Sequence, residues 1–270
     1  MALATQQFGA KRAKRPAKSW FVISPAIWQP VVFFGLLFVA WEVAVSAFNV
    51  RPYLLPRFSV VASALWTARV DLFHNVGITM VEVAFGFAAA VIGGALLGIV
   101  IYASPVARRT IYPFVTALQA MPKSALAPLM VVWFGYGLFS KSAMAFLFAF
   151  FPIVVATLGG FLGTPANLEE HFRALRASSW QTFAMLRLPA ALPIFIDGCK
   201  VAMPLAIIGA IIGEFVGSQD GLGNYLMMAA SSSRTDLMFA AILVITATSM
   251  ILYWLLEILS RWVWWRGIQF

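Results

Sequence analysis

Long runs of apolar residues separated by short polar stretches dominate the chain. A helix needs about 20 residues to cross a bilayer, and six runs come close to or exceed that length: 30–48, 77–103, 111–137, 142–163, 193–216 and 237–256. Hydrocarbon offers no partner for free backbone groups, so the runs are expected to be helical. They also lack the alternation over about ten residues that lipid-facing strands show. The pattern predicts an all-α, polytopic membrane protein with about six transmembrane helices.

Composition supports this prediction. Of the 270 residues, 62% are hydrophobic and only 11% are charged, whereas soluble domains carry about 25% charged residues. So few charges cannot cover a water-facing surface, which excludes a soluble globule, and so much apolar area excludes a disordered chain. The single Cys199 cannot form an internal disulfide and is interpreted as a small apolar residue.

The positions of the charges predict the orientation. If the N-terminus is cytoplasmic, thirteen Lys and Arg residues lie on the inner side and five on the outer side, Lys141 among the five. The positive-inside rule then places both termini in the cytoplasm. Residues 1–29 form a basic cytoplasmic tail that attracts anionic membrane lipid rather than nucleic acid, and residues 30–266 form one transmembrane domain.

Small residues recur at helical spacing in two of the runs. Gly86, Ala90, Gly94 and Gly98 share one helical face, and Gly209, Gly213 and Gly217 repeat the pattern. Such faces let helix backbones approach closely in lipid. They predict either a tight bundle or a dimer interface.

The third run differs because it contains three prolines, Pro113, Pro122 and Pro128. Each removes a backbone donor and disturbs the preceding residue, so a broken span is expected. Lys123 directly follows one predicted break. Two interpretations stay open for it: a place beside a transport pathway, or a side chain that reaches the cytoplasmic headgroups.

Three carboxylates also fall within the runs. Glu214 lies near the end of the fifth run, where it lines the outer gate of a pore or accepts hydrogen bonds at the membrane surface; the neighbouring Gly213 favours the pore. Glu42 and Glu82 lie near the ends of their runs, and both are expected at the membrane interface.

Residues 164–192 form the one long inner loop, with two predicted short helices. Asn167 and Glu170 fit an N-cap with its reciprocal acceptor, as do Ser178 and Gln181. The second helix is expected to stop before Pro189. An apolar stripe runs along the first helix at Leu168, Phe172 and Leu175. It predicts docking into a groove of another protein, or packing against the bundle's own inner face.

This loop resembles the EAA loop of bacterial ABC importer permeases, in particular the branch with the nitrate, sulfonate and taurine permeases. Residues 170–193 read EHFRALRASSWQTFAMLRLPAALP, and the branch reads roughly EAA-x3-GAS-x-WQ-x-F-x4-LPAALP. Further similar stretches are MPKSALAPL with WFGYG, and GEFVG followed by GLG. The likeness extends from about residue 51 to 259.

The resemblance implies a type I ABC importer permease in the bacterial inner membrane. Its expected partners are ABC ATPase subunits, an extracytoplasmic substrate-binding protein and a second permease, with a homodimer expected. The ATPase-coupling residues are then Leu168, Glu170, Phe172, Leu175, Arg176, Ala177, Trp180 and Pro189, and the pathway residues are Pro122, Lys123, Pro128, Gly213 and Glu214.

Two departures from the pattern stand out: His171 and Phe172 replace the motif's two alanines, and Arg176 replaces its glycine. A glycine permits a left-handed turn between the short helices, which arginine adopts only at a cost. Either the joint bends differently, or Arg176 itself contacts the ATPase.

The sequence contains no residue set that is typical of catalysis or ATP binding. It lacks the G-x-x-x-x-G-K-[ST] loop that binds ATP, a metal-ligand cluster and a nucleophile–base set. No enzyme activity, cofactor or metal is therefore expected, and the energy comes from a partner. The alternatives are an ion-coupled secondary transporter, which needs carboxylates at mid-membrane depth, and a membrane enzyme or assembly factor.

Overall fold

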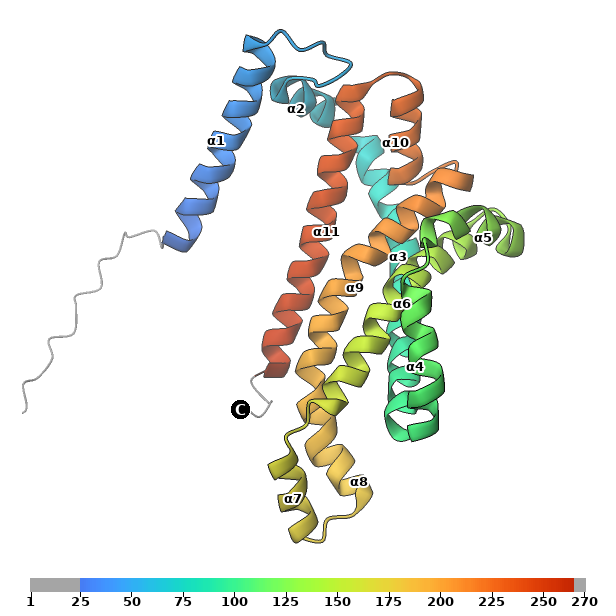
Figure 1. Ribbon diagram of the computed structural model, residues 1–270. Coiled ribbons are helices and arrows are strands. Elements are labelled where there is room, and N and C mark those ends of the chain that lie inside the picture. Colours follow the sequence, from blue (N-terminus) through green and yellow to red (C-terminus); the bar gives the residue numbers. More distant parts are fainter. Residues whose placement is uncertain (1–24, 265–270) are drawn as a thin grey trace, which may run out of the picture.

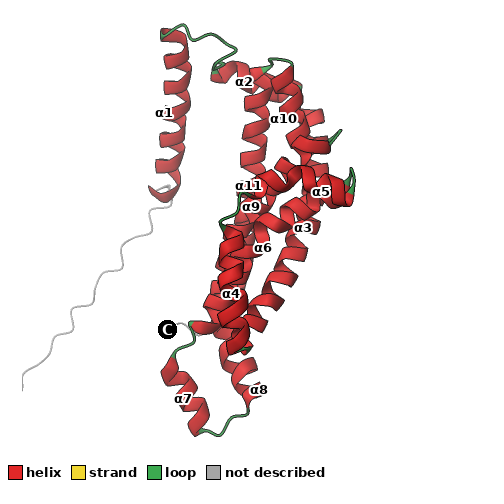
Figure 2. Cartoon of the chain, turned by 45° about the vertical axis from the view of Figure 1, so that its right-hand side comes forward, coloured by secondary structure: helices red, strands yellow, loops and turns green. Residues whose placement is uncertain are grey.

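The computed structural model describes residues 25–264, and this part of the chain is helical without strands (Figures 1 and 2). Five helices are long and apolar enough to cross a membrane: α1 (Pro25–Ala47), α3 (Arg69–Ala103), α6 (Leu138–Leu162), α9 (Leu188–Gly217) and α11 (Thr235–Trp264). A bent pair, α4 (Pro105–Gln119) with α5 (Ala127–Phe134), makes up to six spans. Short helices complete the fold: α2 (Phe58–Thr67), α7 (Ala166–Ala174), α8 (Ser179–Thr182) and α10 (Leu222–Ser231). The all-α, polytopic prediction is confirmed. The basic residues of the predicted tail before residue 25 lie outside the described residues.

Helices α3, α6 and α9 form the centre of the bundle (Figure 1). The predicted small-residue face of α3 packs on α6: a Cβ atom added to Gly98 would lie 2.6 Å from Thr157 Cβ, and one added to Gly94 would lie 2.8 Å from Ile153 Cγ2. On α9, a Cβ at Gly209 would lie 2.5 Å from the Met144 carbonyl oxygen. Real Cβ atoms do not approach so closely, so glycine is needed for these crossings. The small residues therefore serve packing within the bundle.

The third span breaks, but only at one of its prolines. Helix α4 ends at Gln119, a 3₁₀ turn, η1 (Lys123–Leu126), follows Pro122, and the two halves meet at 88°. Pro128 lies in the first turn of α5, where a missing N–H costs nothing. Pro113 stays inside a continuous α4, so the break expected there is wrong. The carbonyl it frees belongs to Arg109, which is exposed and can be solvated.

Two charged residues lie inside the bundle, contrary to expectation. Lys141, expected in an outer connecting segment, belongs to the first turn of α6 and is only 7% exposed. Glu82, expected at the membrane interface, is 2% exposed in the middle of α3. A charge within or beside an apolar run was expected near water, but these two charges pair with each other inside the bundle.

Candidate functional site

The 164–192 segment projects from one end of the bundle as α7 and α8 (Figure 1). An ion pair closes its base, with Arg187 Nε 2.8 Å from Glu169 Oε1. The Arg187 guanidinium also lies over the Tyr102 ring, 5.5 Å from its centroid. The segment is thus fixed at its base to the end of α3, while its tip extends away from the bundle.

The start of α7 differs from the prediction. The helix begins at Ala166 with Pro165 as N-cap, so the expected N-cap at Asn167 is wrong. Pro165 has φ −62° and ψ 129°, the extended geometry that an N-cap requires, two residues earlier in the chain. Because Pro165 already has the N-cap geometry, α7 starts before the position expected from Asn167.

The start of α8 is as predicted. The Ser178 hydroxyl accepts from the Gln181 amide at 3.2 Å, and the Gln181 side chain accepts from the Ser178 amide at 2.8 Å. This is the complete capping box.

The end of the second short helix is not as predicted. A π-helical turn (Phe183–Arg187) joins α8 to α9, and Pro189 lies in the first turn of α9 without ending the helix. In the π turn, backbone N–H groups donate to carbonyls five residues back, as Leu188 does to Phe183. The helix therefore continues past Pro189, which has no N–H to donate. Residues 179–217 consequently form one continuous helix that runs from the 164–192 segment through the bundle.

The joint between α7 and α8 contains a left-handed residue, Arg176, with φ +54°. The Ala177 amide donates to the Phe172 carbonyl at 3.0 Å, and the Arg176 amide donates to the Arg173 carbonyl at 3.0 Å. These bonds make the C-terminal motif in which glycine is the usual left-handed residue. Arginine thus adopts the turn expected of the family's glycine, at a conformational cost.

The coupling residues predicted from the sequence are partly brought together at the tip. Leu175 and Trp180 are 67% and 72% exposed, whereas Leu168, Phe172 and Ala177 are half-buried. Trp180 stacks on Phe183 with ring centroids 5.8 Å apart. Glu170 and Arg176 are exposed and Pro189 is half-buried at the base. The tip therefore presents an apolar surface on a rigid support.

At the broken span, Lys123 folds back onto α6. Its Nζ lies 5.3 Å from the Phe151 ring centroid and 5.7 Å from that of Phe148, and it donates to the Gln119 carbonyl at 3.4 Å. Pro122 and Pro128 are exposed beside it. The pathway role of these three residues stays a prediction.

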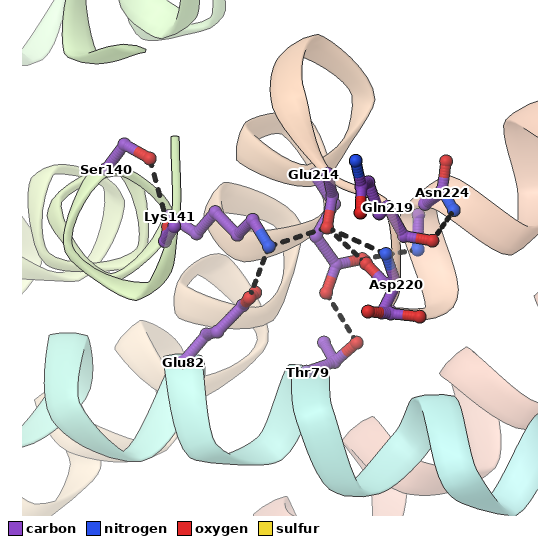
Figure 3. A network of polar contacts seen from close by, with 12 residues as sticks. Thr79, Glu82, Ser140, Lys141, Glu214, Gln219, Asp220 and Asn224 are labelled. Atoms are coloured by element: carbon purple, nitrogen blue, oxygen red, sulfur yellow. Dashed lines mark hydrogen bonds and ion pairs between the residues drawn. The ribbon is translucent and has the colours of Figure 1, made fainter. Parts of the chain in front are cut away.

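A buried charge cluster, which the sequence did not predict, lies near the end of α9 that is opposite the 164–192 segment (Figure 1). It comprises Thr79, Glu82, Lys141, Glu214 and Ser218. Figure 3 shows four of its members, Thr79, Glu82, Lys141 and Glu214. Lys141 Nζ lies 3.0 Å from Glu82 Oε1 and donates to Ser218 Oγ at 2.5 Å. The cluster thereby connects α3, α6 and the end of α9.

Glu214 holds the 217–223 turn, which links α9 to α10. Its carboxylate accepts from Thr79 Oγ1 at 2.6 Å and from the Gly223 amide. Thr79 in turn accepts from the Leu222 amide at 2.9 Å. Gly221 has φ +103°, and a Cβ there would collide with the Glu214 carboxylate, so only glycine fits.

Glu214 and Gly213 are thus both buried in this chain. Glu214 is 1% exposed, and Gly213 packs on Lys141, since a Cβ added to this glycine would lie 3.1 Å from Lys141 Cα. Their direct contact with a transported solute stays a prediction, and what the geometry gives them is support of the 217–223 turn.

The apolar helices, the broken span and the structured segment at one end make up a polytopic membrane protein. Residues 86–265 match the family described as binding-protein-dependent transport system inner membrane component, and the chain belongs to this family of ABC importer permeases. A probable ABC transporter permease protein of Haemophilus influenzae is 32% identical over 87% of this chain and 97% of that protein. The formylaminopyrimidine transport permease protein ThiX of Halalkalibacterium halodurans is 36% identical over 73% of this chain and 79% of that protein.

The fold is also that of a solved permease. An inward facing structure of the MetNI methionine ABC transporter aligns with a TM-score of 0.60 at 21% identity, over 73% of this chain and 96% of that chain. This confirms the type I importer permease fold.

Proposed function

We propose that the chain forms the translocation pathway of an ATP-driven importer for a small solute delivered by an extracytoplasmic binding protein. Its 164–192 segment docks on a cytoplasmic ATPase, and its termini are cytoplasmic. Support comes above all from the exposed apolar tip at Leu175 and Trp180 on a segment whose base is fixed. An apolar helix end of this size suits a groove on a partner.

The mechanism we propose is alternating access. Closure of the ATPases on nucleotide displaces the 164–192 segment, and the continuous 179–217 helix carries this displacement to the opposite end of the bundle. There the charge cluster joins the helix to α3 and to the 217–223 turn. The two bundles of a permease pair then rock about a shared pathway.

A second permease is part of this proposal. The break at 120–122 leaves backbone groups at membrane depth on exposed residues, and such groups persist only when protein covers them or they line a water-filled cavity. A second copy of the chain, facing the break across a pathway lined by η1, α5 and α9, provides both conditions. Lys123 and Pro122 would then border that pathway.

The test is Leu175→Asp in the full chain, reconstituted with its ATPase and binding protein. Loss of a buried leucine contact, worth about 1.5 to 3 kcal/mol, should weaken ATPase docking by about tenfold or more and abolish ATP-dependent uptake. Leu54→Asp, an exposed leucine at the opposite end, is the matched control for docking.

Two outcomes contradict the proposal. One is an unchanged affinity of the Leu175→Asp permease for the ATPase. The other is uptake that survives ATP depletion but stops when an ion gradient is collapsed, which would favour the ion-coupled secondary transporter instead.

A further inference from the structure

A cavity lies where α3 ends and α4 begins, near the base of the 164–192 segment. Its volume is about 440 Å³, and it is lined by Tyr102, Pro105, Arg108, Arg109 and Tyr112. Two arginines and two tyrosines thus border one opening. The proposed transport mechanism uses neither arginine.

The two arginines lack carboxylate partners. Some cations of the bundle are matched with acids, as Arg187 is with Glu169 and Lys200 is with Glu257. Within residues 25–264, Arg108 and Arg109 have no ion pair and no side-chain hydrogen bond. They also occupy the first two turns of α4, where the positive end of the helix dipole disfavours cations. An anion in the cavity would relieve both the mutual repulsion and the unfavourable dipole interaction.

The geometry points to a phosphate group. Arginine forks match phosphate oxygens in bidentate fashion, and tyrosine hydroxyls can donate to the remaining oxygens. Apolar Val106 and Phe114 of the same helix are exposed to the surroundings, so an acyl chain can lie beside them. We infer that this cavity binds the phosphate of an anionic phospholipid headgroup.

The site adjoins the 164–192 segment. Tyr102, which lines the cavity, stacks on Phe161 with centroids 5.0 Å apart and carries the Arg187 guanidinium over its ring. Arg187 in turn closes the base of the segment. A bound headgroup would therefore sit next to the residues that fix the segment. Assignment to the cytoplasmic leaflet rests on the proposed function; binding itself does not.

The experiment uses the purified full-length chain in detergent, titrated with phosphatidylglycerol, phosphatidylcholine or inorganic phosphate. Native mass spectrometry counts retained lipid, and melting temperature reports stabilisation. The wild type should retain phosphatidylglycerol in preference to phosphatidylcholine. Arg108→Gln with Arg109→Gln should weaken that retention by about tenfold or more, as expected for loss of two charge-assisted contacts.

The matched control removes two other exposed arginines at the same end of the molecule, Arg173→Gln with Arg261→Gln. Because the change in net charge is identical, a general attraction of lipid to a basic surface would weaken equally in both double variants. That result, or the absence of any preference for phosphatidylglycerol, would overturn the proposal.

Titration with inorganic phosphate distinguishes a lipid headgroup from a free phosphate ion as the ligand of the cavity. If millimolar phosphate raises the melting temperature only when Arg108 and Arg109 are present, and phosphatidylglycerol has no such effect, the lipid assignment is overturned in favour of a soluble phosphate. An unchanged melting temperature of the ligand-free variant shows that it folds. None of these measurements involves the ATPase or uptake, so they fail or succeed independently of the proposed function.

Discussion

The charge cluster and the 164–192 segment lie at opposite ends of the same continuous helix and use polar groups in opposite ways. In the cluster, Lys141, Glu82 and Glu214 are all buried and bind groups from α3, α6 and the 217–223 turn. In the segment, the ion pair at the base is partly exposed and the apolar tip is uncovered. The cluster end of the helix is therefore bound to other elements of the subunit, whereas the segment end exposes an apolar surface that a partner can cover.

The difference indicates how each end contributes stability. Buried ion pairs lose much of their Coulomb energy to desolvation, but removal of one partner alone is costly because the other charge stays buried. Partly exposed pairs contribute little. The cluster should therefore dominate the stability of the subunit, and the segment should affect mainly the docking proposed for it.

The largest effect is expected for Glu82→Leu. This change leaves the Lys141 ammonium buried without its closest carboxylate, and the free energy of unfolding should fall by about 3 to 5 kcal/mol. Equilibrium unfolding of the purified chain in bicelles measures the loss.

Two controls accompany this variant. Glu82→Leu combined with Lys141→Met should recover much of the lost stability, because neither member of the pair is left as an unmatched charge. Arg234→Gln, which breaks an exposed pair with Asp236, should cost less than about 1 kcal/mol. If Glu82→Leu and Arg234→Gln cost the same, the contrast between buried and exposed pairs does not hold here.

A middle-sized effect is expected for Gly98→Ala on α3. The new Cβ would lie 2.6 Å from Thr157 Cβ and 3.1 Å from the Val154 carbonyl oxygen, so the crossing must widen at a cost of about 1 to 3 kcal/mol. The same unfolding measurement applies.

Gly159→Ala on α6 is the matched control, because no atom lies within 4 Å of its added Cβ. There alanine should stabilise the helix by about 0.5 to 1 kcal/mol. Effects of the same sign at both glycines would contradict the packing described for α3 and α6.

The smallest effect is expected for Arg176→Gly in the 164–192 segment. A left-handed conformation costs a residue with a side chain about 1 to 2 kcal/mol, and the extra freedom of glycine in the unfolded chain offsets about 0.4 to 1 kcal/mol of this. The turn should thus gain up to about 1.6 kcal/mol, and hydrogen exchange at the Ala177 amide should slow.

Arg173→Gly, inside α7, is the counterpart. Its glycine lies in a regular helix, so exchange in α7 should accelerate. Acceleration in both variants would show that the left-handed turn at Arg176 is not strained.

The sequence predicted the features that local chemistry determines. The break after Pro122 and the capping box at Ser178 both depend on residues close in the chain, and both are confirmed. The predictions at Asn167 and Pro189 were wrong for local reasons as well. Pro165 is the N-cap of α7 in place of Asn167, and a π turn before Pro189 lets the helix continue past this residue.

The charge cluster depends on contacts between distant segments, such as the 135 positions between Thr79 and Glu214, and no local rule predicts these. One signal was nevertheless present. Glu82 lies four residues before Gly86 and thus continues the small-residue face of α3, and Lys141 lies four residues before Ala145 on the facing helix. A charge on a face that packs closely must find its partner inside the bundle.

The 39-residue helix from Ser179 to Gly217 has a mechanical consequence. At a rise of about 1.5 Å per residue it is nearly 60 Å long, so it can act as a single lever. Under the proposed mechanism, a small tilt imposed at its 179–187 end would move the 217–223 turn at its other end. Its π turn at 183–187 is where α-helical hydrogen bonding gives way to the wider π pattern.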